Sequence, residues 1–378
     1  MVRLVCCLII LFFPQVSLGE AQIDLRFKTQ KHNVVVRKLV GDLEHPWGLA
    51  FLPNGLFLVS ERSGKLKLIM PDLSQKVVRG LPDVWEHGQG GLLDVVTDPN
   101  FSQNQTIYFS FSQPSFDRRR AGTAVAKAKL ILAKKPVLKK VRIIFSQNIK
   151  SSSSVHFGSR IVISPNRKLF ITIGDRGDSN RAQNPFDHAG SVLRVNTNGS
   201  SPSSNPFFGG KKGLPEIWSI GHRNPQGAIW NTITDSIWTL SHGARGGDEI
   251  NRPLAGKNYG WPIISYGSHY WGAKIGLGTH KSGMEQPVYY WDPSIAPSGF
   301  AIYSGHIFSK WKGNLFVGAL KYQLISRLEL KKGEIVSEER LFANRFGRIR
   351  DIRVGPKGYI YFLTDETDGG LYKISSLD

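Results

Sequence analysis

Cysteine is absent from this sequence outside its first few residues. The two cysteines are Cys6 and Cys7. They lie in a stretch typical of a secretory signal peptide, with Arg3 before an apolar run at residues 4–13 and a small-residue cleavage zone after it. Removing this signal, residues 1–19, would leave no cysteine, which excludes disulfides, thiolate metal sites and cysteine nucleophiles. A lipid anchor on one cysteine is the alternative, although the apolar run continues past both.

Long hydrophobic runs and sustained helical periodicity are also missing. The N-terminal apolar run, about ten residues, is too short to span a hydrocarbon core of roughly 30 Å, and no later segment comes close. We therefore expect no transmembrane segment and a periplasmic or secreted protein. The 40 glycines and 20 prolines indicate many tight turns, which favours an all-β fold.

Acidic residues are too few to balance the basic ones, and the formal net charge is +20. Such a surface can serve nucleic acid, an anionic membrane or an acidic substrate. The cations concentrate at Arg118–Arg120 and between Lys127 and Arg142, where we expect an exposed hairpin. No nucleic-acid-binding motif accompanies them, so no nucleic-acid partner is expected. A solvated basic surface is the simplest interpretation, and an anionic partner is the alternative.

One unit recurs six times along the chain: a Pro/Asn/Gly-type turn followed by a strand rich in β-branched and aromatic residues. The six strands are expected at residues 56–60, 106–111, 168–173, 236–240, 314–318 and 359–364. Six copies at irregular spacing predict a six-bladed β-propeller of four-stranded antiparallel blades, which forms a single domain over residues 20–378. Residues 174–215 and 260–300 have little strand pattern, so we expect them to be long loops that form the walls of a site.

Glycine-rich polar clusters follow several of these strands. Glycine allows a ligand to approach the backbone closely, as a site built from propeller loops requires. The clusters occur in a fixed order: His45-Pro46-Trp47-Gly48-Leu49, Gly88-Gln89-Gly90-Gly91-Leu92-Leu93-Asp94, His156-Phe157-Gly158-Ser159-Arg160, Gly174-Asp175-Arg176-Gly177-Asp178, Gly221-His222-Arg223-Asn224-Pro225-Gln226-Gly227, Gly246-Gly247-Asp248-Glu249-Ile250-Asn251 and Asn258-Tyr259-Gly260-Trp261-Pro262.

This ordered series resembles the aldose sugar dehydrogenases that depend on pyrroloquinoline quinone (PQQ), which are relatives of soluble glucose dehydrogenase. The similarity runs from about His45 to Ile374, nearly all of the mature chain. The resemblance implies PQQ bound on the top face of the propeller, a calcium ion, and oxidation of the anomeric carbon of an aldose to a lactone. It also implies a separate electron acceptor, because the chain has no haem-attachment motif.

Site residues follow from the same resemblance, position by position. His156 falls on the family's catalytic general base, and Glu249 and Tyr259 fall on its calcium ligands. The positions that match its PQQ contacts are Gln89, Arg223, Asn224, Tyr270, Ala319, Leu320, Lys321, Arg348, Ile349 and Arg350.

The chemistry of these residue types agrees with that assignment. PQQ is a planar tricarboxylate, and lysine and arginine are the side chains that bind carboxylates. Alternation along a strand would place Arg348 and Arg350 on one face. Histidine, with an ordinary pKa of about 6.5, suits removal of a hydroxyl proton near neutral pH. Glu249 and a backbone carbonyl at Tyr259 offer the oxygen ligands that calcium prefers, with Asp248 as a competing carboxylate.

One departure from the family pattern concerns Ser241, where a glutamate is expected. Its absence removes a carboxylate near the cofactor loops and could weaken calcium binding. Two other functions remain open at this point: a propeller lactonase, and a non-catalytic propeller that binds sugar or an envelope polymer. The sequence does not indicate the preferred sugar or the oligomeric state.

Overall fold

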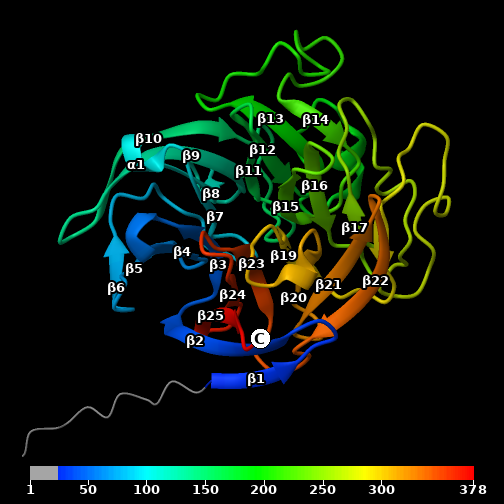
Figure 1. Ribbon diagram of the computed structural model, residues 1–378. Coiled ribbons are helices and arrows are strands. Elements are labelled where there is room, and N and C mark those ends of the chain that lie inside the picture. Colours follow the sequence, from blue (N-terminus) through cyan, green and yellow to red (C-terminus); the bar gives the residue numbers. More distant parts are fainter. Residues whose placement is uncertain (1–23) are drawn as a thin grey trace, which may run out of the picture.

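Six β-sheets surround a central axis (Figure 1) in the computed structural model, which describes residues 24–378. Five sheets have four antiparallel strands and the sixth has five. The protein is therefore a six-bladed β-propeller, as the sequence predicts. The signal peptide expected over residues 1–19 lies outside the described residues.

Each blade is a meander that starts at the axis and ends at the rim. Blade 1 consists of β3 (Pro46–Phe51), β4 (Phe57–Glu61), β5 (Lys65–Ile69) and β6 (Gln75–Val78). Blade 2 consists of β7 (Leu92–Thr97), β8 (Thr106–Pro114), β9 (Ala121–Ile131) and β10 (Val137–Ser146). Blade 3 consists of β11 (Ile161–Ile163), β12 (Lys168–Ile173), β13 (Ser191–Asn196) and β14 (Ile217–Ile220). Blade 4 consists of β15 (Pro225–Asn231), β16 (Ser236–Ser241), β17 (Asp248–Asn251) and β18 (Tyr289–Trp291). Blade 5 consists of β19 (Pro297–Ile302), β20 (Leu315–Ala319), β21 (Leu324–Lys331) and β22 (Glu334–Leu341).

Blade 6 closes the ring with strands from both ends of the chain. It comprises β23 (Ile349–Val354), β24 (Ile360–Thr364), β25 (Gly369–Ser376), β2 (Asn33–Leu43) and β1 (Asp24–Lys28). The N-terminal strand β2 pairs antiparallel with the C-terminal strand β25, with Val36 opposite Ile374. The first and last parts of the described chain therefore hold each other in one sheet.

The six turn-strand units of the sequence correspond to the second strand of each blade: β4, β8, β12, β16, β20 and β24. These strands are flanked on both edges by other strands and are buried almost throughout; in β12, for example, all residues after Lys168 are buried. Double burial favours the β-branched and aromatic residues that made these strands recognisable in the sequence.

Helices contribute little to the fold. The described residues contain the single-turn helix α1 (Phe101–Asn104) and three short 3₁₀ segments, Pro53–Gly55, Ser179–Gln183 and Ser309–Trp311. None of the described helices is long and apolar enough to cross a membrane.

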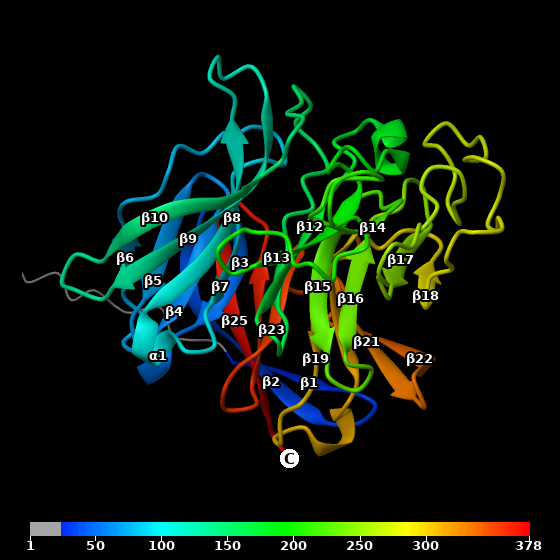
Figure 2. The same ribbon diagram turned by 90° about the horizontal axis from the view of Figure 1, so that it is seen from above.

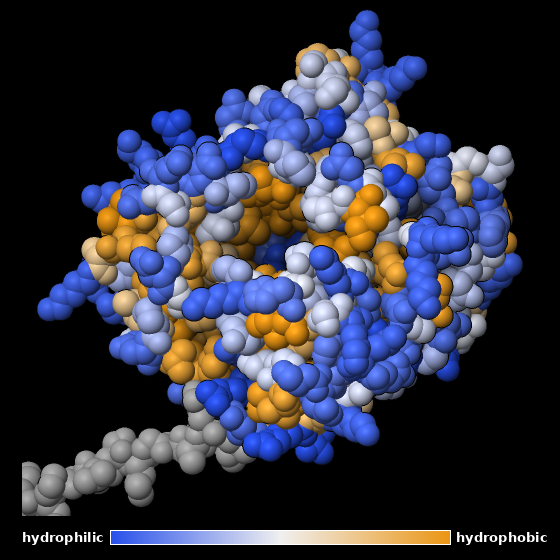
Figure 3. Space-filling view, viewed as in Figure 1, coloured by the Kyte–Doolittle hydropathy of each residue, from blue (hydrophilic) through white to orange (hydrophobic). Residues whose placement is uncertain are grey.

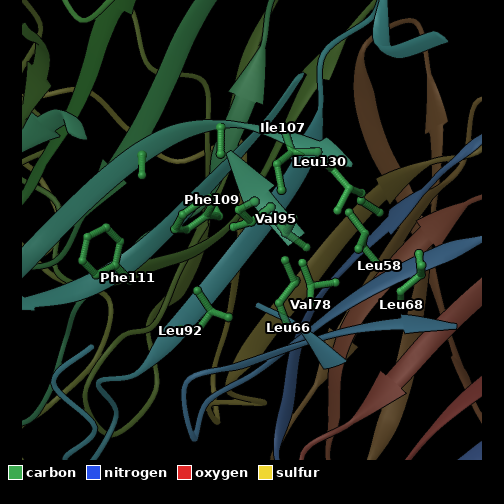
Figure 4. Packing of buried hydrophobic residues seen from close by; sticks show 14 of the residues in the cluster. Leu58, Leu66, Leu68, Val78, Leu92, Val95, Ile107, Phe109, Phe111 and Leu130 are labelled. Carbon is green, nitrogen blue, oxygen red and sulfur yellow. The ribbon is translucent and has the colours of Figure 1, made fainter. Parts of the chain in front are cut away.

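Hydrophobic side chains of neighbouring blades pack face to face. Between blades 1 and 2, Leu58 and Leu68 lie against Val95 and Phe109, and all four are almost completely buried (Figure 4). Each buried side chain of this kind stabilises the fold by roughly 1.5–3 kcal/mol. Packing between blades thus holds the inner strands, whose ends carry the site, in fixed positions.

The two segments expected to be long loops contain strands. Residues 174–215 include β13, and residues 260–300 include β18 and most of β19. The polar residues of β13 concealed it, because Arg194 is buried inside the blade. Its guanidinium lies 4.2 Å from the ring centroid of Trp218 and donates to Asn205 at 2.7 Å. The rest of both segments, residues 174–190, 197–215, 260–288 and 292–296, contains no strand.

The two faces of the propeller differ. In Figure 2 the yellow loop between β17 and β18 and the teal loop after β8 rise on one side. On the other side, seen in Figure 3, the channel opens as a hollow with largely hydrophobic walls and a volume of about 480 Å³. Between the two faces, Arg160 and Arg353 pair with Asp94 and Asp351 at 2.9–3.1 Å. This ion-pair cluster occupies the axis.

Candidate active site

His156 lies in the segment between β10 and β11, at the loop-bearing face of the propeller. Its backbone has φ of +56°, which is rare for a residue with a side chain. The backbone N–H of His156 donates to Oε1 of Gln89 at 2.8 Å, so a neighbouring blade fixes its position. Gln89 is in turn held by a backbone bond to Ser154 at 2.7 Å. An unusual backbone held from two sides indicates a residue placed for function.

Asp175 orients the imidazole of His156. Oδ1 of Asp175 lies 2.7 Å from Nδ1 of His156 and accepts from the N–H of Gly177, while Oδ2 accepts from the indole of Trp261 at 2.8 Å. Burial tends to raise the pKa of Asp175, but the bond from His156 and the Arg223 charge outweigh it, and the pKa falls below its usual value. The carboxylate can only accept, so Nδ1 carries a proton and Nε2 is left as the basic nitrogen.

Arg176 fixes the segment that carries His156. Its guanidinium donates to the backbone carbonyls of Ser153 and Val155 and lies 3.3 Å from the ring centroid of Phe157. Burial lowers the pKa of Arg176 to about 9. Arg176, three residues after β12, thus holds the segment by hydrogen bonds before His156 and by a cation–π contact with Phe157 after it.

Two cavities meet at His156. The larger, about 1100 Å³, extends from Gln89 and Arg223 to Lys321, and the smaller, about 400 Å³, is lined by Asp175 and Trp261. His156, Arg223, Ala244 and Tyr270 line both cavities. An adjoining pair of cavities of these sizes can accept a cofactor and a second small molecule on either side of one histidine.

The larger cavity is cationic. Arg223, Arg245, Lys274 and Lys321 line it, together with Asp292 as the single acidic side chain. Arg223 donates to the carbonyl oxygens of Gly243 and His242, but its buried Nε has no partner. This cavity fits an anionic planar ligand, and the fit is chemical as well as steric, because a carboxylate would satisfy the unpaired N–H.

Arg348 and Arg350, which were expected on one face of a strand, lie in different environments, and only Arg350 belongs to a strand. Arg350 is buried in β23, where it pairs with Asp365 and donates to Gln226 at 2.6 Å. Arg348 precedes β23, is exposed, and reaches the carbonyl of Leu320 at 3.5 Å. Arg348 is therefore the more available of the two for a ligand, and Arg350 is largely neutralised by Asp365.

Of the remaining residues predicted to contact the cofactor, some line the larger cavity and others are buried. Tyr270 is 70% exposed at the rim and Lys321 lines the larger cavity. Asn224 is buried, accepts from Gly158 at 3.2 Å and has an unpaired side-chain N–H. Buried apolar supports behind the cavity are Ala319, Leu320 and Ile349.

Ser241 has a structural contact at the position where a glutamate was expected. Its hydroxyl oxygen accepts from the backbone N–H of Asn224 at 3.2 Å, and the side chain is buried. Nε2 of the adjacent His242 donates to the Pro297 carbonyl at 2.7 Å, and burial lowers the pKa of His242 to about 3. The cavity wall here is thus uncharged, formed by a hydroxyl and a neutral imidazole.

Glu249 and Asp248 are adjacent in β17 but differ in their bonding. Asp248 accepts from Ser294 and from the backbone N–H groups of Gly243, Ile295 and Ala296, so its oxygens are used by the fold. Glu249 accepts from Asn251 at 2.9 Å, and burial raises its pKa to about 7. A deep carboxylate with a raised pKa favours a nearby cation, which identifies Glu249 as the better ligand candidate.

Tyr259 is in the loop after β17, with its ring stacked on His222 at 4.8 Å and its hydroxyl bonded to the backbone of Arg252 and Leu254. Only its backbone oxygen could be a ligand. Over residues 24–378 no group of three or more His, Cys, Asp or Glu side chains is placed to hold a metal ion. A calcium site here would depend on carbonyl oxygens and water in addition to Glu249.

Sequence reasoning missed three cavity residues: Asp175, Trp261 and His242. Asp175 and Trp261 belong to motifs given above, and the signal for Asp175 was its position two residues after the buried strand β12. His242 lies outside those motifs. The structure places His222 in the core, where Nε2 bonds Ser219 at 2.9 Å, and His188 beside Glu216 at 3.4 Å.

Comparison with known proteins identifies relatives over most of the chain. Residues 43–373 match the family model described as Glucose / Sorbosone dehydrogenase. The chain is 42% identical over 349 residues to aldose sugar dehydrogenase YliI of Escherichia coli (strain K12), covering 90% of this chain and 93% of that protein. It is 26% identical over 442 residues to quinoprotein glucose dehydrogenase B of Acinetobacter calcoaceticus, covering 96% and 91%.

Solved structures agree. The soluble aldose sugar dehydrogenase of Escherichia coli in its apo-form superposes with a TM-score of 0.88 at 41% identity, over 91% of this chain and 99% of that chain. A crystal structure described as glucose dehydrogenase gives 0.87 at 42% identity, over 89% and 98%. The resemblance seen in the sequence motifs is confirmed, and the chain belongs to the glucose/sorbosone dehydrogenase family of oxidoreductases.

Proposed function

We propose that this protein is an exported, PQQ- and calcium-dependent dehydrogenase that oxidises the anomeric carbon of aldose sugars to lactones. The observation that carries the proposal is the His156–Asp175 pair at the junction of a large cationic cavity and a smaller one. The quinoprotein relative supports the choice of cofactor.

The residues of the larger cavity match what PQQ would require. Arg223 and Lys321, which line this cavity, would bind the PQQ carboxylates together with the exposed Arg348, which reaches the carbonyl of Leu320 next to Lys321; Tyr270 would cover PQQ at the rim. When bound, PQQ supplies an electrophilic quinone carbon that accepts a hydride. Glu249 would hold calcium, with the Tyr259 carbonyl as a second oxygen ligand.

His156 acts on the sugar hydroxyl. Since Nδ1 donates to Asp175, Nε2 is the atom that accepts the proton from the anomeric hydroxyl as C1 becomes a carbonyl carbon. The imidazolium that results is stabilised by the Asp175 carboxylate, whose low pKa keeps it ionised. Trp261 and Gly177 hold that carboxylate in place.

Reconstitution tests the proposal. The mature chain, residues 20–378, is purified without its signal, loaded with PQQ and calcium, and assayed for dye reduction with glucose and other aldoses. We expect turnover that requires both additions and a PQQ absorbance that stays with the protein. No bound PQQ and no turnover would overturn the proposal; sugar binding without turnover would indicate a non-catalytic sugar-binding propeller instead.

The variant His156→Ala separates chemistry from binding. It should bind PQQ as the wild type does but lose kcat by roughly 10²–10⁴-fold, the usual contribution of a general base. PQQ titration and steady-state kinetics measure the two quantities. An unchanged kcat would remove His156 from the role of base.

A further inference from the structure

Blade 2 carries an unusual span of sequence. From Arg118 to Lys150 the chain contains no aspartate or glutamate, while it contains 11 lysines and arginines. This span includes the two outer strands of the blade, β9 and β10, which make the basic hairpin expected from the sequence. We call the exposed residues of this part of the blade the basic edge: Phe116, Arg119, Arg120, Lys139, Lys140, Arg142, Ile143 and Ile149.

Like charges face each other across this hairpin. Lys129 lies directly opposite Lys139, and Lys127 lies opposite Arg142. Pairs of this kind destabilise a sheet, because the two side chains point to the same face at close range. Within residues 24–378, none of these four side chains forms an ion pair. Electrostatic repulsion between these opposed cations therefore destabilises the hairpin, and no ion pair in the described residues offsets it.

Protection of an exposed sheet edge does not explain why like charges face each other. Outer strands are commonly protected from aggregation by charged side chains, lysine above all, but this protection does not require cations directly opposite one another. The outer strand of blade 5, β22, shows the ordinary solution: it carries Glu338 beside Arg340, which pair at 3.4 Å. An uncompensated row of cations instead indicates an anionic partner outside the molecule.

Phe116 is presented at the tip of the loop between β8 and β9 and is fully exposed. The loop is closed by backbone bonds, from Ser115 to the Arg120 carbonyl at 2.8 Å and from Arg118 to the Ser115 carbonyl at 3.0 Å. The Trp85 indole also donates to the Arg118 carbonyl at 3.2 Å. The loop rises above the body of the propeller (Figure 2). It carries the fully exposed Phe116 two residues before Arg118, which pairs with Asp83, and close to Arg119 and Arg120, which have no ion pair among the described residues.

Further apolar side chains alternate with the cations along β10 and beyond it. Ile143, next to Arg142, is 46% exposed, and Ile149, next to Lys150, is 48% exposed. The Lys150 ammonium donates to the Pro114 carbonyl at 2.8 Å, so this segment is joined to the base of the Phe116 loop. A soluble polyanion would need only the cations. Cations interleaved with apolar side chains fit a lipid headgroup region, which offers phosphates and acyl chains together.

We propose that the basic edge binds the surface of an anionic phospholipid membrane, with its lysines and arginines on lipid phosphates and Phe116 inserted between headgroups. None of these residues lines the two cavities at His156. The proposal is therefore independent of the proposed function, and failure of one does not affect the other.

Vesicle co-sedimentation of the mature chain tests it. The protein should pellet with vesicles containing phosphatidylglycerol but not with phosphatidylcholine alone, and added salt should weaken binding. The variant K139E/K140E/R142E should bind roughly 100-fold more weakly, since each cation near an anionic surface adds about a tenfold factor or less. The matched control K211E/K212E/K357E changes the same number of exposed lysines or arginines elsewhere and should bind as the wild type does.

The variant Phe116→Ser distinguishes lipid from other anions. It should weaken vesicle binding several-fold while leaving its salt dependence unchanged, and thermal unfolding should confirm that each variant is folded. Equal binding to both vesicle types, no binding to either, or equal loss in the control variant would overturn the proposal. So would unchanged binding of Phe116→Ser together with equally tight binding of soluble dextran sulfate, which would identify a general polyanion surface.

Discussion

The imidazole of His156 has one ring nitrogen available for chemistry, because the other is bonded to Asp175. Two further bonds hold Asp175 itself, from Gly177 at 2.8 Å and from Trp261 at 2.8 Å. The position of the proton-accepting imidazole thus depends on Asp175, and the position of Asp175 depends on Trp261 in the loop after β17. Small changes at Asp175 should alter catalysis more than cofactor binding.

The substitution Asp175→Asn tests this directly. An amide would favour the wrong tautomer of His156 or leave its Nδ1–H unpaired, and it could not stabilise an imidazolium. We expect kcat to fall by roughly 10²–10⁴-fold, with PQQ affinity nearly unchanged, as measured by steady-state kinetics and PQQ titration. The exposed Asp178→Asn, in the same loop, is the control and should retain activity. Equal rates for the two variants would contradict an orienting role for Asp175.

The sequence motifs indicated which residues lie at the candidate site, but they did not indicate which of the charged residues are neutralised by a partner. Gln89, Arg223 and Lys321, which the resemblance assigns to PQQ contacts, line the larger cavity. The pairing of Arg350 with Asp365 could not be foreseen, because Asp365 directly follows β24, whose register with β23 has a shift between Ile349 and Asp351. Which arginine is free for a ligand depends on that register, and the sequence pattern does not contain it.

At the scale of secondary-structure elements, recognition depended on burial. The second strand of each blade was predicted because both of its edges and both of its faces are covered, which requires a continuous apolar run. Strand β13 was missed because it carries Arg194 inside the blade, where Trp218 and Asn205 satisfy the guanidinium. A buried cation with local partners breaks the pattern that sequence reasoning uses.

In blade 6, the neighbouring strands β1 and β2 should contribute differently to stability. Strand β2 pairs with β25 and closes the ring, whereas β1 only adds an outer edge to β2. A chain starting at Lys31, without β1, should remain folded with its thermal midpoint lowered by several degrees, since it loses the packing of Phe27 on Phe342 at 4.8 Å.

A chain starting at Glu44, which lacks β2 as well, should not fold as a stable monomer. Without β2 the buried Val34 and Val36 are lost and the strand β25 becomes an exposed apolar edge. Circular dichroism and calorimetry measure the thermal midpoints of the two truncated chains side by side. Similar midpoints for the two truncations would show that the ring does not depend on β2 for closure.

The whole molecule is held at its axis by charge as well as by apolar packing between blades. Asp94 of blade 2 accepts from Arg160 at 3.0 Å and from Arg353 at 2.9 Å, which joins blades 2, 3 and 6. The substitution Asp94→Asn would leave two buried guanidiniums short of one negative charge. Breaking such a buried pair typically costs about 3–5 kcal/mol.

Chemical denaturation would measure this cost as a shift in the unfolding midpoint. The exposed Asp72→Asn, in the turn between β5 and β6, is the control and should change stability by less than about 0.5 kcal/mol. A similar small change for Asp94→Asn would mean that the axial cluster is neutral in its effect on stability.

Acid should destabilise the whole propeller through its buried imidazoles, and His222 gives the clearest case. Its side chain is almost completely buried, and burial lowers its pKa from 6.5 to about 3. Between these values the unfolded chain binds a proton that the folded chain does not, so stability is complete above pH 6.5 and falls as the pH decreases towards 3. At pH 5 the loss from this group is about 2 kcal/mol, because each pH unit below 6.5 costs about 1.4 kcal/mol.

Urea unfolding at pH 8 and pH 5 tests the assignment. The wild type should lose more stability between these values than His222→Gln, which cannot take up a proton in either state. His280→Gln is the matched control: His280 is exposed, bonds Thr279 at 2.7 Å, and should leave the pH dependence as it is. The substitution also removes the stacking of His222 on Tyr259 and therefore lowers stability at every pH. The contribution of His222 to acid sensitivity is thus the difference between the two proteins in the change of unfolding free energy from pH 8 to pH 5. Parallel slopes for the wild type and His222→Gln would assign the acid sensitivity to other groups, of which the buried His242 is the first to test by the same substitution.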